Sequence, residues 1–171
     1  RRRSNGREIV TVRNVFPPET HLTFKQASCR NGNSLHILYA GTIGRAQNLG
    51  NALEAVRIAK AAGTDIRFRI VGSGAEKNEL RNRSRDLGGS VSFESVRPAD
   101  ELATYYEWAD TALVHLADWE PLERTVPSKV YELLDSRIHV SAVVEGETAK
   151  LVAGLNAGDV VAPDNPQALA E

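Results

Sequence analysis

Apolar runs of strand length alternate with runs of helical periodicity along nearly the whole chain. The predicted strands cover residues 8–13, 35–40, 66–71, 91–95, 111–116, 139–144 and 159–161. The predicted helices lie between the later strands, at residues 47–62, 75–87, 99–109, 128–135 and 147–155. Because strict alternation requires right-handed crossovers, it predicts an α/β protein with a Rossmann-like parallel sheet and helices on both faces.

The segment before the second predicted strand has a different composition. Residues 16–34 are rich in Pro, Asn, Ser and Gly, which is typical of a linker or an irregular approach to a sheet. We therefore expect residues 1–34 to form an interdomain linker with a leading strand, and residues 35–171 to form one domain. Methionine is absent, even at the first position, so we expect the chain to be a fragment of a longer protein.

Composition argues against several classes of protein. The formal net charge is −1, and no apolar run reaches the length of a membrane span, so we expect a soluble, cytoplasmic domain that binds no nucleic acid. Cys29 is the single cysteine and the four histidines lack metal-ligand spacing, so we expect neither a disulfide nor a metal site. His115, near a strand end, is the one histidine that we expect beside a ligand.

Ligands of parallel sheets bind at the carboxyl ends of the strands, so the loops there are the first candidates for a site. The loop after residues 35–40 contains Gly41, Gly44 and Arg45. Its glycines would let the backbone approach a ligand, and the guanidinium group could bind a phosphate through two parallel hydrogen bonds. A tight turn followed by a surface arginine is an equally good interpretation of these residues.

The next loop, with Gly72 and Gly74, resembles the start of a dinucleotide-binding fingerprint. Lys77 stands where that fingerprint requires its third glycine. The sequence therefore argues against a nicotinamide or flavin dehydrogenase. The glycines would allow close approach to a sugar nucleotide, or they serve a simple turn from strand to helix.

A third loop, residues 93–98, precedes a helix with several aromatic residues. Its backbone could hydrogen-bond to the edge of a nucleotide base, and Arg97 could stack on that base. In the helix, Leu102, Tyr105 and Tyr106 fall on one face, together with Ala109. We expect these aromatic residues to pack in the core.

Residues 126–132, with the sequence Val-Pro-Ser-Lys-Val-Tyr-Glu, have the features of an anion-binding helix start. The first amides of a helix lack partners and carry the positive end of its dipole, which suits a phosphate. We expect Ser128 to cap the helix and Lys129 to add a positive charge. Glu132 follows one turn later, where its carboxylate could accept hydrogen bonds from a ribose diol. An ordinary capped helix with a solvated glutamate is the alternative.

In order and spacing, these features resemble the C-terminal, donor-binding half of a retaining glycosyltransferase of group 1, also called family 4, which has the two-Rossmann-domain GT-B fold. The matching segments are residues 39–49, 70–74, 91–93, 106–110, 127–132, 145–149, 157–158 and 163–166. They extend over most of residues 35–171. The most similar members are bacterial transferases of surface polysaccharides and amino sugars, which carry Pro-Ser-Lys before a ribose-binding glutamate.

The resemblance implies a role for several residues. Glu132 would hold the ribose hydroxyls, Ser128 and Lys129 would form the diphosphate-binding helix start, and Gly44 and Arg45 would cover the diphosphate. The family pairs two glutamates separated by seven residues, but here the first position is Arg124. We name the neighbouring Glu123 as the carboxylate expected to meet the donor sugar.

The resemblance also implies a reaction and partners. A nucleotide-diphosphate-sugar would donate its sugar to a glycan or lipid-linked acceptor without a metal or other cofactor. The acceptor would be bound by an N-terminal domain that is absent from this sequence and that could bring the enzyme to a membrane. Two alternatives stay open: a sugar-nucleotide epimerase of similar architecture, and a non-catalytic nucleotide-binding α/β domain.

Overall fold

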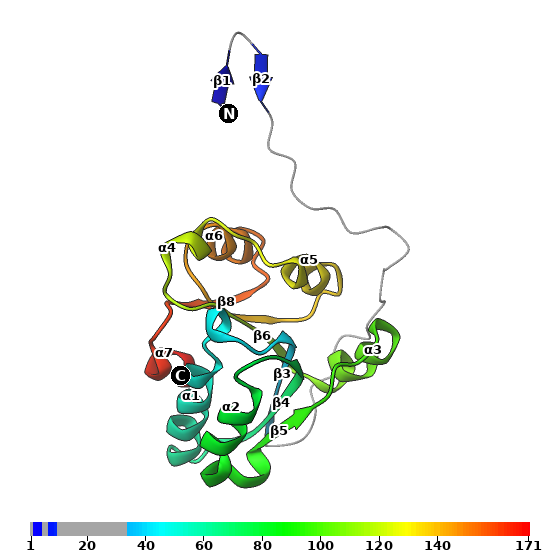
Figure 1. Cartoon of the computed structure of the whole chain (residues 1–171), viewed down its shortest axis with the longest axis vertical. Coiled ribbons are helices and arrows are strands. Elements are labelled where there is room, and N and C mark those ends of the chain that lie inside the picture. The colour runs from blue at the N-terminus through cyan, green and yellow to red at the C-terminus, as the bar shows by residue number, and fades with distance from the viewer. Residues whose placement is uncertain (1, 5–6, 10–33) are drawn as a thin grey trace.

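The chain folds around a six-stranded parallel sheet with the strand order β5-β4-β3-β6-β7-β8 (Figure 1). The computed structural model describes residues 2–4, 7–9 and 34–171. The strands are β3 Ser34–Thr42, β4 Asp65–Ser73, β5 Val91–Glu94, β6 Thr111–His115, β7 Val140–Val143 and β8 Gly158–Val161. The strand order reverses between β3 and β6, which creates a topological switch point of the Rossmann type.

Helices connect successive strands and cover both faces of the sheet. They are α1 Leu49–Ala61, α2 Lys77–Arg83, α3 Ala99–Trp108, α4 Glu120–Glu123, α5 Ser128–Asp135, α6 Gly146–Gly154 and α7 Pro166–Ala170. Within residues 34–171, two 3₁₀ helices, η2 Arg45–Gln47 and η3 Arg85–Ser90, complete the connections. The predicted fold class is therefore confirmed.

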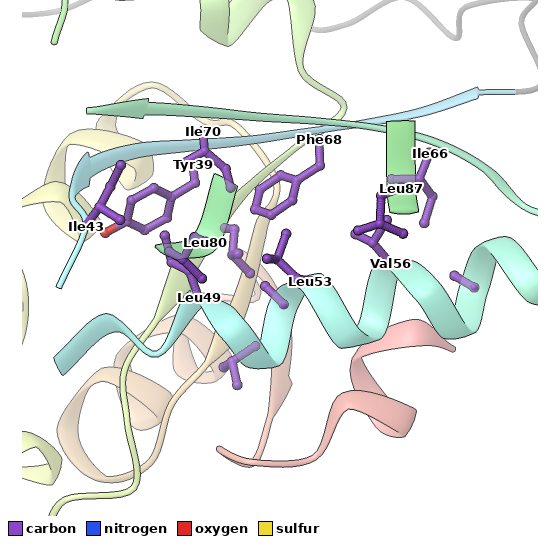
Figure 2. Close-up of a cluster of buried hydrophobic side chains, with 14 residues drawn as sticks. Tyr39, Ile43, Leu49, Leu53, Val56, Ile66, Phe68, Ile70, Leu80 and Leu87 are labelled. Carbon is purple, nitrogen blue, oxygen red and sulfur yellow. The ribbon is translucent and has the colours of Figure 1, made fainter. Parts of the chain in front are cut away.

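Two separate cores lie on the two faces of the sheet. On one face, α1 buries Leu49, Leu53 and Val56, one turn apart, against strands β3 and β4 (Figure 2). On the other face, α3, α5 and α6 pack against β6 and β7. Strand β3 serves both cores, because Leu38 and Tyr39 alternate between the faces and are both fully buried.

Two short helices lay outside the predicted pattern. Helix α4 spans four residues and α7 spans five, so neither shows a helical period in the sequence. Local signals mark α7, because Pro166 occupies its first turn and the Asn165 side chain accepts a hydrogen bond from the Ala168 amide at 3.0 Å.

The leading segment is described only in part. Strand β1, Arg2–Ser4, pairs antiparallel with β2, Arg7–Ile9. The strand predicted at residues 8–13 overlaps β2, and its remaining residues lie outside the described part of the chain, as does most of the linker predicted for residues 1–34. Among the described residues, no helix has both the length and the apolar character needed to cross a membrane.

Candidate functional site

A pocket of about 420 Å³ opens at the carboxyl edge of the sheet, between α3 and α5. We call it the α3–α5 pocket. It is lined by Ala40, Gly41, Thr42, Val71, Gly72, Ser73, Val96, Arg97, Leu102, Tyr106, Ser128, Lys129 and Glu132. These residues come from the ends of β3 and β4, the loop after β5, and the two helices, so one pocket brings together loops that are far apart in the sequence.

Helix α5 presents its polar side to this pocket because its apolar side is packed on the sheet. Val130 and Leu133 are buried one turn apart, which leaves Ser128, Lys129 and Glu132 to line the pocket. The predicted cap is wrong: Pro127 occupies the N-cap position and its side chain makes no capping hydrogen bond, while Ser128 is the first helical residue. The helix amides nearest Ser128 are therefore not satisfied by a side-chain cap at that position.

Lys129 reaches the end of β3. Its Nζ atom lies 3.9 Å from the centre of the Tyr39 ring, in a cation–π contact. A methyl group built on Gly41 would stand 2.6 Å from that same Nζ, so only glycine leaves room for the ammonium group there. Burial lowers the pKa of Lys129 from 10.5 to about 8, while the charge of Glu132 opposes this shift.

Glu132 lies across the pocket from α3. The Tyr106 hydroxyl donates a hydrogen bond to Glu132 Oε1 at 3.2 Å. Burial raises the pKa of the Tyr106 phenol, and the neighbouring Glu132 carboxylate adds to that effect. Tyr106 therefore stays neutral and donates to the carboxylate, which still has lone pairs for a ligand.

Arg97 sits at the mouth of the pocket between two carboxylates. Its guanidinium nitrogens lie 3.5 Å from Glu94 and 3.3 Å from Glu101. Its Nε atom is buried and has no hydrogen-bond partner within the described residues. Because two carboxylates already neutralise this arginine, its flat guanidinium is better suited to stack on a planar ligand than to bind a phosphate.

The two glycines at the end of β4 have a structural role. Gly72 has a φ of +151°, and a Cβ atom there would lie 1.9 Å from the carbonyl oxygen of Gly41. A Cβ atom on Gly74 would lie 2.0 Å from the carbonyl oxygen of Ile43. These two positions let the ends of β3 and β4 and the loops that follow them pack backbone to backbone, so packing by itself requires glycine there.

The structure gathers six of the ten residues predicted for the site in one pocket. They are Gly41, Gly72, Arg97, Ser128, Lys129 and Glu132. The other four are Gly44, Arg45, Gly74 and Glu123, none of which lines the α3–α5 pocket. Arg45 lines a separate polar pocket, and Glu123 lines a small cleft near α4 with Asp118 and Glu145.

His115 lies beneath the carboxyl edge of the sheet and lines none of these pockets. It is 1% exposed, its Nε2 atom lies 3.0 Å from the Asn51 side-chain nitrogen, and burial lowers its pKa to about 4. A neutral imidazole fixed by Asn51 serves to join β6 to α1. The described residues contain no group of three His, Cys, Asp or Glu side chains arranged to hold a metal ion.

Two residues of the site were missed in the sequence. Tyr39 supports Lys129, and its hydroxyl donates to the carbonyl of Thr42, so it also holds the loop after β3. Tyr106 was assigned to the core alone, although it also bonds to Glu132. Each lies in an apolar pattern that predicts burial, and no local signal shows that a buried tyrosine will point its hydroxyl toward a ligand site.

A comparison with protein families identifies the chain. Residues 34–171 match the sequence model of the family described as "Glycosyl transferases group 1". The chain belongs to the group 1 glycosyltransferase family. The match covers the whole of the folded domain described above, so the resemblance inferred from the sequence is confirmed.

Solved structures of glycosyltransferases have the same fold. The catalytic domain of cholesterol-α-glucosyltransferase from Helicobacter pylori matches with a TM-score of 0.61 and 15% identity, over 80% of this chain and 81% of that protein. The C-terminal domain of the group 1 protein LpcC from Francisella tularensis matches with a TM-score of 0.60 and 16% identity, over 80% and 71% of the two chains.

A third relative was solved with ligands. Anabaena Alr3699/HepE, in complex with UDP and glucose, matches with a TM-score of 0.62 and 20% identity, over 81% of this chain but 37% of that protein. At these identities the likeness establishes the fold, which is one half of a GT-B architecture. No curated protein matches the chain in a sequence comparison.

Proposed function

We propose that this domain binds the nucleotide-diphosphate-sugar donor of a retaining glycosyltransferase, and that the whole enzyme transfers the sugar to a glycan or lipid-linked acceptor. The observation that carries the proposal is the convergence, in the α3–α5 pocket, of Lys129, the start of α5 and the Glu132 carboxylate. Lys129 and the helix start suit a negatively charged diphosphate, and the Glu132 carboxylate can accept hydrogen bonds from a ribose diol.

The proposed donor lies along α5. Its diphosphate accepts hydrogen bonds from the first amides of α5 and from Lys129, whose ammonium group lies below Gly41. Its ribose hydroxyls donate to Glu132, one turn further along the helix. Its base then stacks near Arg97, with the apolar side chains of Val96 and Leu102 beside it.

The chemistry follows from where charge builds up. In the proposed retaining transfer, the bond from the sugar to the diphosphate breaks through an oxocarbenium-like state, and negative charge accumulates on the leaving diphosphate. Lys129 and the α5 amides would stabilise that charge without reorganising, since they are already held in place. Two predicted roles stay hypotheses: Arg45 would cover the diphosphate, and Glu123 would meet the donor sugar.

The acceptor and the cellular setting are also part of the proposal. In a two-domain enzyme the reaction takes place in the cleft between the domains, and the other domain binds the acceptor. We propose that a second, N-terminal domain has this role. Through it, a cytoplasmic enzyme would reach a lipid-linked acceptor at a membrane.

Titration calorimetry with UDP, GDP and ADP tests the donor site. We expect the chain to bind one of the three nucleotides, and Glu132→Ala to weaken that binding by roughly ten- to a hundredfold, since hydrogen bonds to a charged group contribute about 1.5–3 kcal/mol. The matched control is Glu54→Ala, because Glu54 is a half-exposed glutamate on α1 that pairs with Arg57. Equal affinity in the wild type and Glu132→Ala would contradict the proposal.

A further inference from the structure

A second polar pocket, of about 270 Å³, opens at the same carboxyl edge of the sheet. We call it the Trp119 pocket. Its principal side chains are Arg45, Glu76, Glu79, Arg83, Asp118 and Trp119. They come from η2, from α2 and the residue before it, and from the loop after β6, so the pocket lies where the connections after β3, β4 and β6 meet. The proposed contacts of the base and the ribose use residues of the α3–α5 pocket, and Arg45 is the residue of the Trp119 pocket that is also expected near the diphosphate.

Trp119 is placed as an exposed platform at this pocket. It is 48% exposed, and the other large apolar side chains that are exposed in the described part of the chain are all aliphatic. Its backbone is fixed on both sides, because its amide donates to Ala117 at 2.8 Å and its carbonyl accepts from the Leu122 amide at 2.7 Å. Contact between water and a large apolar ring at the rim of a pocket is unfavourable, and a ligand that covers the ring would remove it.

Five of the six charged groups of the pocket are free to meet a ligand, and the sixth, Asp164, accepts a hydrogen bond from Asn48. Within residues 34–171, no ion pair or side-chain hydrogen bond joins Arg45, Glu76, Glu79, Arg83 or Asp118 to another side chain. This contrasts with the α3–α5 pocket, where Arg97 and Glu132 already have partners. Unpaired carboxylates and guanidinium groups around an aromatic ring are the donors and acceptors that a polyhydroxylated ligand requires.

The pocket is held together before any ligand arrives. The Asn48 side-chain amide donates to Asp164 at 2.6 Å, which ties the loop after β3 to the loop after β8. The Ala117 amide donates to the Ala46 carbonyl at 2.8 Å, which ties the same loop to the end of β6. Because these loops do not have to be ordered on binding, the cost of forming the site is small.

We infer that the Trp119 pocket binds a glycosyl unit that is neutral or carries an amino group, with the sugar ring stacked on Trp119 and its hydroxyls bonded to the surrounding carboxylates. The inference rests on the proposed donor function. Thr42 of the α3–α5 pocket and Arg45 of the Trp119 pocket are three residues apart, so at most about 11 Å of chain separates them. The sugar of the donor, or the acceptor sugar to which it is transferred, could therefore occupy the Trp119 pocket.

The balance of charge selects the kind of sugar. Four carboxylates line the pocket, from Glu76, Glu79, Asp118 and Asp164, against the two guanidinium groups of Arg45 and Arg83. A sugar acid would add a further negative charge among them, whereas a neutral sugar can accept from the guanidinium groups and donate to the carboxylates. An anionic sugar should therefore bind more weakly than a neutral or amino sugar of the same shape.

The two tryptophans of the chain allow a direct test by NMR. The indole N–H signals of Trp108 and Trp119 can be followed in ¹⁵N-labelled protein, and Trp119→Phe assigns them. Trp108 is the internal control, because it stacks on His36 at 4.6 Å and under the Arg69 guanidinium at 4.0 Å. The whole chain would be titrated with glucose, glucosamine, N-acetylglucosamine and glucuronate, each up to tens of millimolar, and separately with UDP, UDP-glucose and UDP-N-acetylglucosamine.

The expected result is a saturating shift of the Trp119 signal with a neutral or amino sugar, little response to glucuronate, and no shift of Trp108. A response to the free sugars assigns the pocket to the acceptor, whereas a response only to a UDP-sugar, at concentrations where UDP alone has no effect on Trp119, assigns it to the donor sugar. Trp119→Ala should weaken sugar binding at least tenfold, with Leu155→Ala as the control for loss of an exposed apolar side chain.

Two outcomes would overturn the inference. One is a Trp119 signal that responds to none of the sugars or sugar nucleotides, and the other is glucuronate binding as well as glucose. Failure of the donor proposal would look different, because then no UDP, GDP or ADP binding would be detected by calorimetry, whatever the Trp119 signal did. A circular dichroism spectrum equal to that of the wild type shows that each variant is folded.

Discussion

Replacing Lys129 with methionine should make the protein more stable and its donor site weaker. Burial lowers the pKa of Lys129 from 10.5 to about 8. Below both values the lysine is charged in the folded and the unfolded chain, and the shift then corresponds to about 3 kcal/mol of cost to the folded state. The cation–π contact with Tyr39 returns about 1–2 kcal/mol of this, and methionine has a similar volume, so the net gain near neutral pH is on the order of 1–2 kcal/mol.

The pH dependence provides the decisive test of this reasoning. Between about pH 8 and pH 10.5 the folded chain has released the Lys129 proton while the unfolded chain still holds it, so the stability of the wild type rises relative to that of the variant. Urea unfolding followed by circular dichroism should therefore show a difference between the two proteins that shrinks as the pH is raised. The matched control is Lys150→Met on α6, whose lysine side chain is 76% exposed, and it should change stability by less than about 0.5 kcal/mol at either pH.

The same variant should lose affinity for the nucleotide that the wild type binds, by about tenfold or more, because a charged hydrogen bond to the diphosphate is removed. In the wild type, affinity should fall as the pH rises above about 8, since the free lysine then loses its charge. A Lys129→Met variant that is less stable than the wild type near neutral pH, or a stability difference that is the same at about pH 7 and pH 10, would show that burial of the charged lysine does not cost stability.

Three further variants test other parts of the site. Gly41→Ala should weaken nucleotide binding severalfold, because its methyl group would stand 2.6 Å from Lys129 Nζ and displace it, and calorimetry that finds unchanged affinity would contradict this contact. Tyr106→Phe should weaken nucleotide binding by a few-fold, with a loss of about 1 kcal/mol, since it removes the hydroxyl that holds Glu132; unchanged affinity would show that Glu132 needs no such support. Gly72→Ala should lower the free energy of unfolding by more than about 2 kcal/mol, because its methyl group would lie 1.9 Å from the Gly41 carbonyl oxygen. In the same urea unfolding experiment the control Gly154→Ala should be nearly neutral, because its methyl group would enter open space.

Periodicity in the sequence predicts the sheet and the helices because burial on two faces imposes it. Helix α5 begins and ends where the pattern predicts, at residues 128 and 135, and each predicted strand from residue 35 onward overlaps an observed strand. The same pattern cannot show which side of a turn is a pocket. Lys129 illustrates the limit: the sequence suggests a mobile charge, but the cavity left by Gly41 and the ring of Tyr39 bury its ammonium group, and both lie far away in the sequence.

The position of Glu123 shows how packing between distant segments decides what a sequence motif can do. A Cβ atom on Gly146 would lie 2.0 Å from the Glu123 carbonyl oxygen, and the Thr148 hydroxyl donates to the Thr125 carbonyl at 2.7 Å. The end of α4 is thus fixed against the start of α6, on the side of the cleft with Glu145. Asp118 lines both that cleft and the Trp119 pocket, so it is the carboxylate of this loop that shares a pocket with Arg45. Where the family pattern places its first glutamate, this chain has Arg124, which is 78% exposed and paired with Glu120 at 2.6 Å. Because the side chain at that position lies in solvent, no packing contact among the described residues requires a carboxylate there.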